Sequence, residues 1–154
     1  MGALSENELT TSGYCFACGA RNVYGLRMRV GYEDEAAVCR LTLGRQYQGW
    51  DEIAHGGIVS TVLDEIMAYA VINYVGQGLT TRMEITYRKA VPLGVPLKAV
   101  GRVTGHRSRM ATAEGRIYLA GEETLLAEAS SRWIIKLGPD GKPMDGQAWL
   151  DSQR

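Results

Sequence analysis

The sequence lacks an excess of either charge, a long uninterrupted apolar run and a basic or apolar beginning. Seventeen Lys and Arg residues balance 17 Asp and Glu residues, so the totals favour neither a nucleic acid nor an anionic membrane as partner. The most apolar stretch is interrupted by Asp64, Glu65 and Asn73, and it falls short of the roughly 20 apolar residues of a membrane span. The first residues resemble no secretory signal, so we expect none.

Cysteines are few, and the sequence has no internal repeats or low-complexity segments. An odd number of cysteines, three, without an export signal predicts reduced thiols and a cytoplasmic location. A chain of 154 residues is long enough to bury a core and is most simply one domain. We expect a flexible arm over residues 1–13, one folded domain over 14–137 and an irregular tail over 138–154.

Two of the cysteines, Cys15 and Cys18, form a C-x-x-C pair. Structural zinc sites use four ligands, and neither Cys39 nor the histidines His55 and His106 stand at ligand spacing. A redox pair would be expected near a βαβ pattern, which the surrounding sequence does not predict. We therefore expect a structural turn and no metal ion, with metal binding and redox chemistry as the alternatives.

Six segments alternate apolar and polar residues as half-buried β-strands do. Two precede and four follow the most apolar stretch of the chain; they span residues 26–32, 37–43, 80–90, 96–106, 109–120 and 124–137. The last is the clearest, because every second residue from Leu125 to Ile135 falls on one face. Segments rich in Gly, Pro and acidic residues separate the strands and predict turns.

Between the second and third strands, the sequence predicts a long helix over about residues 57–75, ending at Gly76. A helix this apolar is buried on most sides. Ionised carboxylates are almost never fully buried alone, so Asp64 and Glu65 near its middle must each be paired, at an interface or in a site. The order β-β-α-β-β-β-β predicts an α+β fold, with one long helix wrapped by an antiparallel sheet of about six strands.

The segment His55-Gly56-Gly57, followed by Asp64, resembles the hotdog-fold acyl-CoA thioesterases, in particular the phenylacetate-pathway and 4-hydroxybenzoyl-CoA thioesterase branches. The pattern C-F-x-C-G-x-x-N-x-x-G-L over residues 15–26 resembles the opening of many members, and residues 80–87 resemble the first strand after the helix. The resemblance implies an acyl-CoA hydrolase that forms a homodimer or a dimer of dimers. It implies no cofactor, since coenzyme A is part of the substrate.

The resemblance also implies roles for individual residues. Gly56 matches the residue whose backbone N–H polarises the thioester carbonyl, and Asp64 matches the carboxylate that attacks the thioester or activates water. Thr80 matches a hydroxyl that orients water in some members. Those members carry an amide side chain shortly before the His-Gly-Gly motif; here Gly49 holds that position, and only the adjacent Gln48 offers an amide.

The chemistry of thioester hydrolysis fits the start of this helix. First-turn N–H groups are unpaired and carry partial positive charge, so Gly56 and Gly57 suit an oxyanion hole, although they would also serve a plain turn. Asp64 lies eight positions beyond Gly56, about 12 Å along a helix. The two groups therefore cannot act on one thioester from one helix, and we expect two antiparallel helices from two chains with two composite sites.

The remaining candidates are weaker. We expect His55 to fix the turn by hydrogen bonding, with catalytic proton transfer as the alternative, and His106 to lie on the surface. Glu65 is the second carboxylate candidate, as a substrate contact or as the partner of a basic strand residue. Candidates for binding coenzyme A phosphates and lining the acyl pocket are Arg82, Arg88, Lys89, Arg107, Arg109, Tyr47, Gln48 and Trp50.

Two other functions stay open. A hotdog hydratase or dehydratase is disfavoured because the motif is His-Gly-Gly and lacks the phenylalanine-proline-glycine surroundings of acyl-carrier dehydratases. A non-catalytic acyl-CoA-binding domain would keep the pocket without needing Asp64. The acyl group itself is not predicted, because a short aromatic and a medium aliphatic chain both fit.

Overall fold

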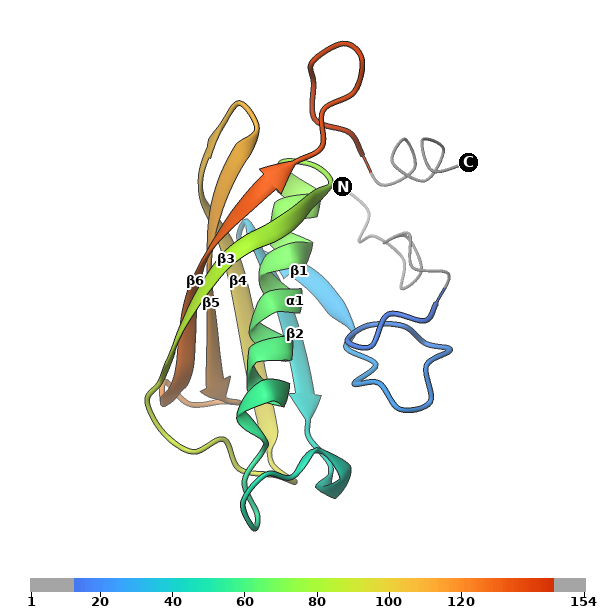
Figure 1. Ribbon diagram of the computed structural model, residues 1–154. Coiled ribbons are helices and arrows are strands. Elements are labelled where there is room, and N and C mark those ends of the chain that lie inside the picture. Colours follow the sequence, from blue (N-terminus) through green and yellow to red (C-terminus); the bar gives the residue numbers. More distant parts are fainter. Residues whose placement is uncertain (1–12, 146–154) are drawn as a thin grey trace.

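One long helix lies across a curved antiparallel sheet of six strands (Figure 1). The computed structural model describes residues 13–145. Its elements are β1 (Val30–Glu33), β2 (Ala36–Thr42), the 3₁₀ turn η1 (Arg45–Tyr47), α1 (Gly56–Tyr74), β3 (Gly78–Tyr87), β4 (Pro96–Arg107), β5 (Met110–Leu119) and β6 (Leu125–Ile135). The strands are ordered β1-β2-β4-β5-β6-β3. The predicted α+β architecture is confirmed.

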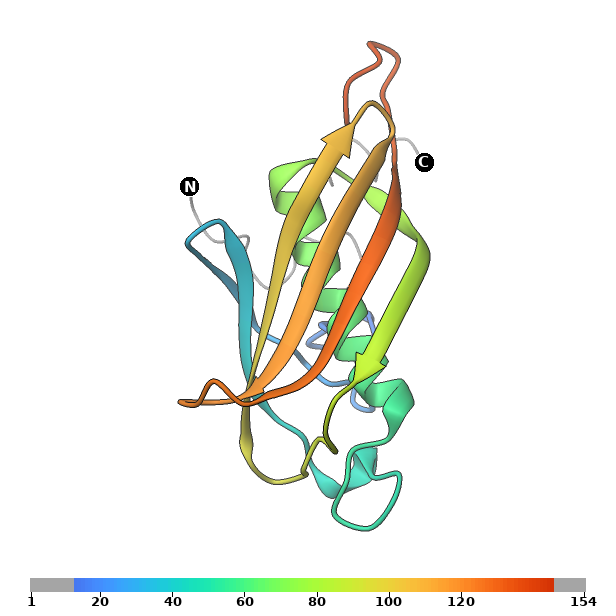
Figure 2. The ribbon, with the colours of Figure 1, turned by 90° about the vertical axis from the view of Figure 1, so that its left-hand side faces the viewer.

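The core lies between α1 and the concave face of the sheet. The helix contributes fully buried Leu63, Ile66 and Met67, each worth about 1.5–3 kcal/mol of burial free energy. Small side chains on the facing strands, among them Ala99 and Ala113, let the helix approach closely. Figure 2 shows β4, β5 and β6 side by side with α1 behind them. The alternation in β6 puts its buried residues on this inner face.

The helix comes closest to the sheet at Gly101 in β4. A Cβ atom built there would lie 2.7 Å from the carbonyl carbon of Ile66 and 3.1 Å from the backbone nitrogen of Met67. Gly115 on β5 stands opposite Gly101 in the ladder, and a Cβ there would lie 3.1 Å from Cγ of Met67. The two glycines thus remove side chains where the helix crosses the sheet.

Gly101→Ala is expected to destabilise the protein by about 2–3 kcal/mol, because its new methyl group meets helix backbone that cannot rotate away. The melting temperature should fall by roughly 4–12 °C in a thermal unfolding experiment. Gly31→Ala in β1 is the matched control, since a Cβ there meets nothing within 4 Å. Equal stability of the two variants would show that α1 is not held against β4 as described.

The first strand starts later than predicted. β1 begins at Val30, whereas the alternation begins at Leu26. Arg27 has a φ of 51°, a left-handed conformation that interrupts an extended strand. The N–H of Met28 instead donates to the carbonyl of Ala17 at 2.8 Å, so this segment pairs with the chain near the two N-terminal cysteines.

Residues 138–145 form turns and one isolated β-bridge. The N–H of Gly138 donates to the carbonyl of Lys142 at 2.8 Å, and Leu137 and Pro143 form a β-bridge. Residues 138–145 form no helix or strand, and the irregular tail stays a prediction. The rest of the predicted tail and nearly all of the predicted N-terminal arm lie outside the described residues. Between residues 13 and 145, no helix has the length and apolarity needed to cross a membrane.

Candidate active site

α1 begins at a turn built by His55 and two glycines. His55 is the N-cap residue, and its Nδ1 accepts a hydrogen bond from the N–H of Gly57 at 2.9 Å. An accepting ring nitrogen carries no proton, so in this geometry His55 serves as a cap. Gly56 occupies the first helical position, where a backbone N–H has no acceptor within the helix. Of the two predicted oxyanion donors, Gly56 is therefore the available one.

The space around the two glycines also differs. A Cβ atom at Gly57 would lie 3.1 Å from Nδ1 of His55, so the cap itself favours glycine there. A Cβ atom at Gly56 would come no closer than 3.6 Å to the hydroxyl of Tyr87, an ordinary contact. The packing of the chain itself therefore does not require a glycine at position 56. A glycine there would instead allow another molecule to approach the backbone closely.

Asp64 and Thr80 are brought together by α1 and β3. The Thr80 hydroxyl donates to Oδ1 of Asp64 at 2.8 Å, in a partly buried position. The register of β3 against β6 shifts between Thr80 and Arg82, and such bulges re-aim neighbouring side chains, often beside active sites. The contact holds one carboxylate oxygen of Asp64 in a fixed direction.

Gly56 and Asp64 are nevertheless far apart within one chain. Both belong to α1, and eight residues at the helical rise separate them by about 12 Å. A carbonyl oxygen held at the N–H of Gly56 places its carbon beyond the reach of the Asp64 carboxylate of the same chain. If Gly56 and Asp64 act on the same thioester, as predicted, the two residues must therefore come from different chains.

A hollow of about 250 Å³ lies beside Gly56, and we call it the Gly56 hollow. Its lining residues are Ile53, Ala54, Gly56, Val59, Tyr87, Arg88, Lys89, Ala90 and Val91. The Tyr87 hydroxyl donates to the carbonyl of Gly56 at 2.9 Å, which ties the end of β3 to the start of the helix. Sequence reasoning missed Tyr87, because no local pattern reports a contact between residues so far apart. The hollow is smaller than the roughly 300–1,000 Å³ of ligand pockets.

Two of the predicted substrate contacts in the loop before α1, Gln48 and Trp50, differ in their surroundings. Gln48 is engaged within the loop: its amide donates to Oδ1 of Asp51 at 3.3 Å and accepts from the N–H of Glu52 at 3.2 Å. The side chain of Trp50 is 83% exposed, a large apolar surface left in water. Gln48 thus makes contacts within the loop, and substrate contacts by Gln48 and Trp50 stay predictions.

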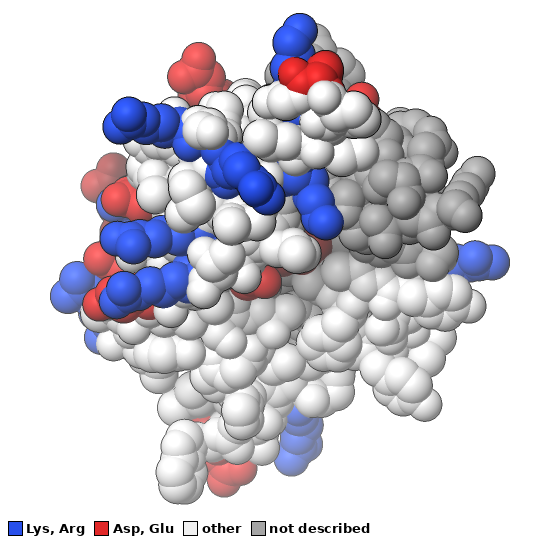
Figure 3. All heavy atoms as spheres, turned by 45° about the horizontal axis from the view of Figure 1, so that its top comes forward, with Lys and Arg blue, Asp and Glu red and all other residues white. Residues whose placement is uncertain are grey.

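The predicted coenzyme A-binding cations fall into two groups. Arg88 and Lys89 line the Gly56 hollow. Arg107 and Arg109 flank the exposed turn between β4 and β5, which lies at the C-terminal end of α1 (Figure 1). Figure 3, in which this end comes forward, shows several Lys and Arg side chains grouped on it. Within one chain the two groups lie at opposite ends of the helix.

Arg82 and His106 belong to neither group. Arg82 lies 4.0 Å from Glu84 with both side chains mostly exposed, and such surface pairs contribute little to stability. His106 is exposed, and its Nε2 lies 3.0 Å from the carbonyl of Ser108 in the same turn. A role for Arg82 in substrate binding stays a prediction.

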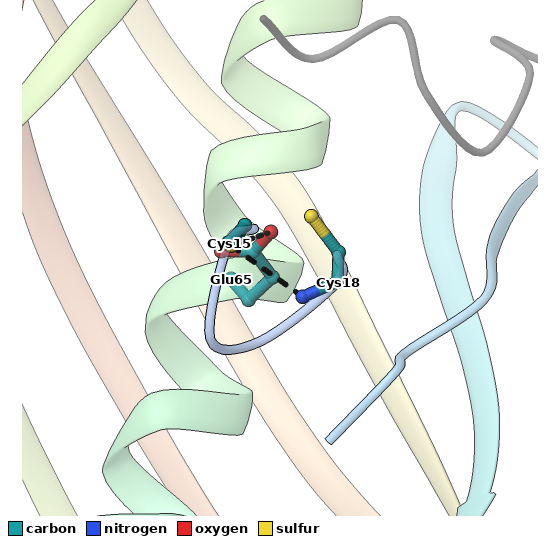
Figure 4. Close-up of side chains that lie close together, drawn as sticks. All are labelled: Cys15, Cys18 and Glu65. Carbon is teal, nitrogen blue, oxygen red and sulfur yellow. Dashed lines mark hydrogen bonds between the residues drawn. The ribbon is translucent and has the colours of Figure 1, made fainter. Parts of the chain in front are cut away.

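Glu65 contacts the turn that contains Cys15 and Cys18 (Figure 4). The Sγ of Cys15 lies 3.7 Å from Oε1 of Glu65. Burial raises the pKa of Glu65 to about 7, and the hydrogen bond with the Cys18 side chain lowers the pKa of Cys15 to about 5. The same bond raises the pKa of Cys18. Asp64 and Glu65 thus contact different elements, β3 and the N-terminal turn, and Glu65 is occupied away from the Asp64–Thr80 pair.

Comparison with known proteins agrees with this architecture. Residues 52–126 match the sequence model of the thioesterase superfamily. No curated protein sequence matches the chain. Among similar solved structures, a thioesterase superfamily protein has a TM-score of 0.75 and 21% identity, covering 87% of this chain and 66% of its own. The chain thus spans slightly less than two thirds of that protein.

Two further solved structures match this chain over most of their own length. A hypothetical thioesterase from Streptococcus pneumoniae TIGR4, solved with coenzyme A, has a TM-score of 0.67 and 19% identity over 77% of this chain and 91% of its own. The PaaI protein of the E. coli phenylacetic acid degradation operon has a TM-score of 0.65 and 19% identity over 71% and 83%. With one helix wrapped by six antiparallel strands, this chain has the hotdog fold, and its residues 52–126 match the thioesterase superfamily.

Proposed function

We propose that the protein hydrolyses acyl-CoA thioesters to a free acid and coenzyme A, at two composite sites formed by two copies of the chain. The observation that carries the proposal is the placement of Gly56 and Asp64 about 12 Å apart on one helix. The first offers a backbone donor and the second a carboxylate oriented by Thr80. Each group needs a partner that only a second helix can bring.

The edge of the sheet supports a second copy as that partner. β3 is ten residues long and forms one edge, and a long open edge is a template for pairing with another chain. Leu79 and Tyr87 on this strand are more than half exposed. A two-fold axis beside β3 would set the two α1 helices antiparallel and close to each other. A dimer, alone or paired into a tetramer, would cover the β3 edge of each chain.

The antiparallel arrangement also joins the two groups of cations. It brings the C-terminal end of one helix towards the N-terminal end of the other. Arg107 and Arg109 of one chain then approach Arg88 and Lys89 of the other chain. A paired set of arginines and lysines suits the phosphates of coenzyme A, and a similar solved structure was obtained with coenzyme A.

In the proposed reaction, the thioester oxygen accepts a hydrogen bond from the N–H of Gly56, and the helix dipole favours the negative charge that develops there. Asp64 of the other chain attacks the carbonyl carbon, or removes a proton from a water molecule that attacks it. Collapse of the tetrahedral intermediate breaks the carbon–sulfur bond and releases the coenzyme A thiolate, which takes up a proton. In the covalent version, water then hydrolyses the acyl-Asp64 anhydride.

No cofactor is needed, because coenzyme A is the leaving group. The three cysteines are free thiols, which suits a reaction in the reducing cytoplasm.

The proposal is tested by measuring thiol release from a panel of aromatic and aliphatic acyl-CoAs. We expect turnover of at least one of them, and the preferred acyl group then defines the substrate class. If the protein binds acyl-CoAs in calorimetry and releases no thiol, it is an acyl-CoA-binding domain and the proposed hydrolysis is wrong.

A further inference from the structure

Cys15, Cys18 and Glu65 form a cluster that the proposed hydrolysis does not use. Figure 4 shows the two cysteines on the N-terminal turn beside Glu65 of α1. One ligand atom of each, the two Sγ atoms and a carboxylate oxygen, all lie within 4.8 Å of one another. We propose that these three residues bind one Zn²⁺ ion, which attaches the N-terminal turn to the central helix.

The spacing of the three ligand atoms is close to that of a tetrahedral zinc site. Zinc–sulfur and zinc–oxygen bonds of about 2.3 and 2.1 Å place neighbouring ligand atoms roughly 3.4–3.8 Å apart. The Sγ of Cys15 and Oε1 of Glu65 are already 3.7 Å apart. No pair among the three exceeds 4.8 Å, so rotations of these side chains suffice to complete the coordination.

The backbone of the turn is arranged around the sulfur of Cys15. The N–H of Cys18 points at Sγ of Cys15 at 3.4 Å, and backbone donors to sulfur stabilise the thiolate that binds a metal. The N–H of Gly19 donates to the Cys15 carbonyl at 2.9 Å. A Cβ atom at Gly19 would lie 2.6 Å from the nitrogen of Cys15, so the tight turn depends on this glycine. The Cys-x-x-Cys spacing is that of zinc-binding turns.

The surroundings of Glu65 favour a bound cation over two protonated thiols that only hydrogen-bond to the carboxylate. Its carboxylate is partly buried, and the hydrogen-bonding partners that the described residues offer it are the thiols of Cys15 and Cys18. Thiols are weak donors, which compensate poorly for a carboxylate withdrawn from water. A divalent ion would neutralise the acidic groups together. Two thiolates with one carboxylate suit zinc, whereas calcium and magnesium prefer oxygen ligands alone.

Three protein ligands leave one coordination position of the ion for water. The ion would not take part in the proposed hydrolysis, since Glu65 contacts the N-terminal turn and Asp64 contacts Thr80 of β3. Its effect is structural: it fixes residues 15–18 on the middle of α1, close to the helical turn that carries Asp64. Metal content and hydrolytic activity can therefore be measured independently.

The test is the zinc content of the full chain, produced with added zinc, kept reduced with a phosphine and purified without chelators. We expect about one zinc per chain by mass spectrometry, and Co²⁺ added to the metal-free protein should give a thiolate-to-metal charge-transfer band. Cys15→Ser and Cys18→Ser should lose the band and the zinc. Glu65→Gln should weaken zinc binding at least about tenfold in competition with a chromophoric chelator.

Cys39→Ala is the matched control, because Cys39 is the third free thiol and is buried in β2, outside the cluster. It should bind zinc as the wild type does, and circular dichroism checks the fold of every variant. A wild-type chain that carries no zinc and gives no Co²⁺–thiolate band overturns the proposal, whether or not the variants fold. Unchanged zinc affinity in Glu65→Gln would also overturn it, because the carboxylate would then not be a ligand.

Discussion

Asp64→Asn is expected to lower kcat for acyl-CoA hydrolysis by at least about 100-fold, with KM changed only a few-fold. The amide is nearly the same size as the carboxylate and can still accept the hydrogen bond from Thr80, which is 2.8 Å long in the wild type. It can neither attack the thioester carbon effectively nor take a proton from water. The loss therefore falls on the chemical step, which single-turnover measurements of thiol release isolate.

Glu123→Gln provides the matched control for Asp64→Asn. Glu123 is an exposed carboxylate in the turn between β5 and β6, and its replacement should leave kcat unchanged. Folding and oligomeric state of both variants are checked by circular dichroism and sedimentation. If folded Asp64→Asn retains more than about a tenth of wild-type kcat, the carboxylate is not the nucleophile or base.

Gly56→Pro is expected to lower kcat/KM by on the order of 10²–10³, because proline has no N–H to donate to the oxyanion. The backbone should accept proline here. Gly56 is the first helical residue, a position where proline is favoured. His55 has φ −57° and ψ 136°, the extended conformation that a following proline requires. The variant thus removes one donor with little expected change in fold.

Gly56→Ala separates the loss of the donor from simple obstruction. Alanine keeps the N–H, and its Cβ would lie at least 3.6 Å from the chain's own atoms. Gly56→Ala should therefore retain clearly more activity than Gly56→Pro. Equal losses in the two variants would mean that bulk at this position blocks the substrate, and that the N–H is not the oxyanion donor.

The sequence predicted the fold well because its patterns are long and regular. The apolar stretch predicts a helix over residues 57–75, and α1 spans Gly56–Tyr74. The alternation over 124–137 matches β6, Leu125–Ile135, to within two residues at each end. Both elements are buried on one long face, so tertiary packing reinforces the local preference.

The departures arise where a contact between distant parts of the chain decides the structure. The left-handed backbone at Arg27 delays the start of the first strand from Leu26 to Val30, and no residue type at this position predicts it. The Cys15–Cys18 pair is a recognisable motif, but its third partner, Glu65, is 50 positions from Cys15 along the chain. Spacing rules for metal ligands cannot find such a residue, because the helix brings it there only in the folded protein.

The candidate site was predictable in part. The helical rise alone separates Gly56 from Asp64 and leads to the two-chain site. The distinction between the two glycines was not predictable, since it depends on the bond from the Gly57 N–H to Nδ1 of His55. The contact of Thr80 with Asp64 likewise depends on how β3 passes the helix.

The composite site is tested most directly by the activity of dimers that mix Asp64→Asn and Gly56→Pro chains. Each variant alone should be nearly inactive. In a mixed dimer, the Gly56 of one chain meets the Asp64 of the other at one intact site. Random reassociation of equal amounts makes half of the dimers mixed, so about a quarter of wild-type thiol release should return. If the mixture is no more active than its two parents, the two groups do not act together across the dimer, and the composite site is wrong.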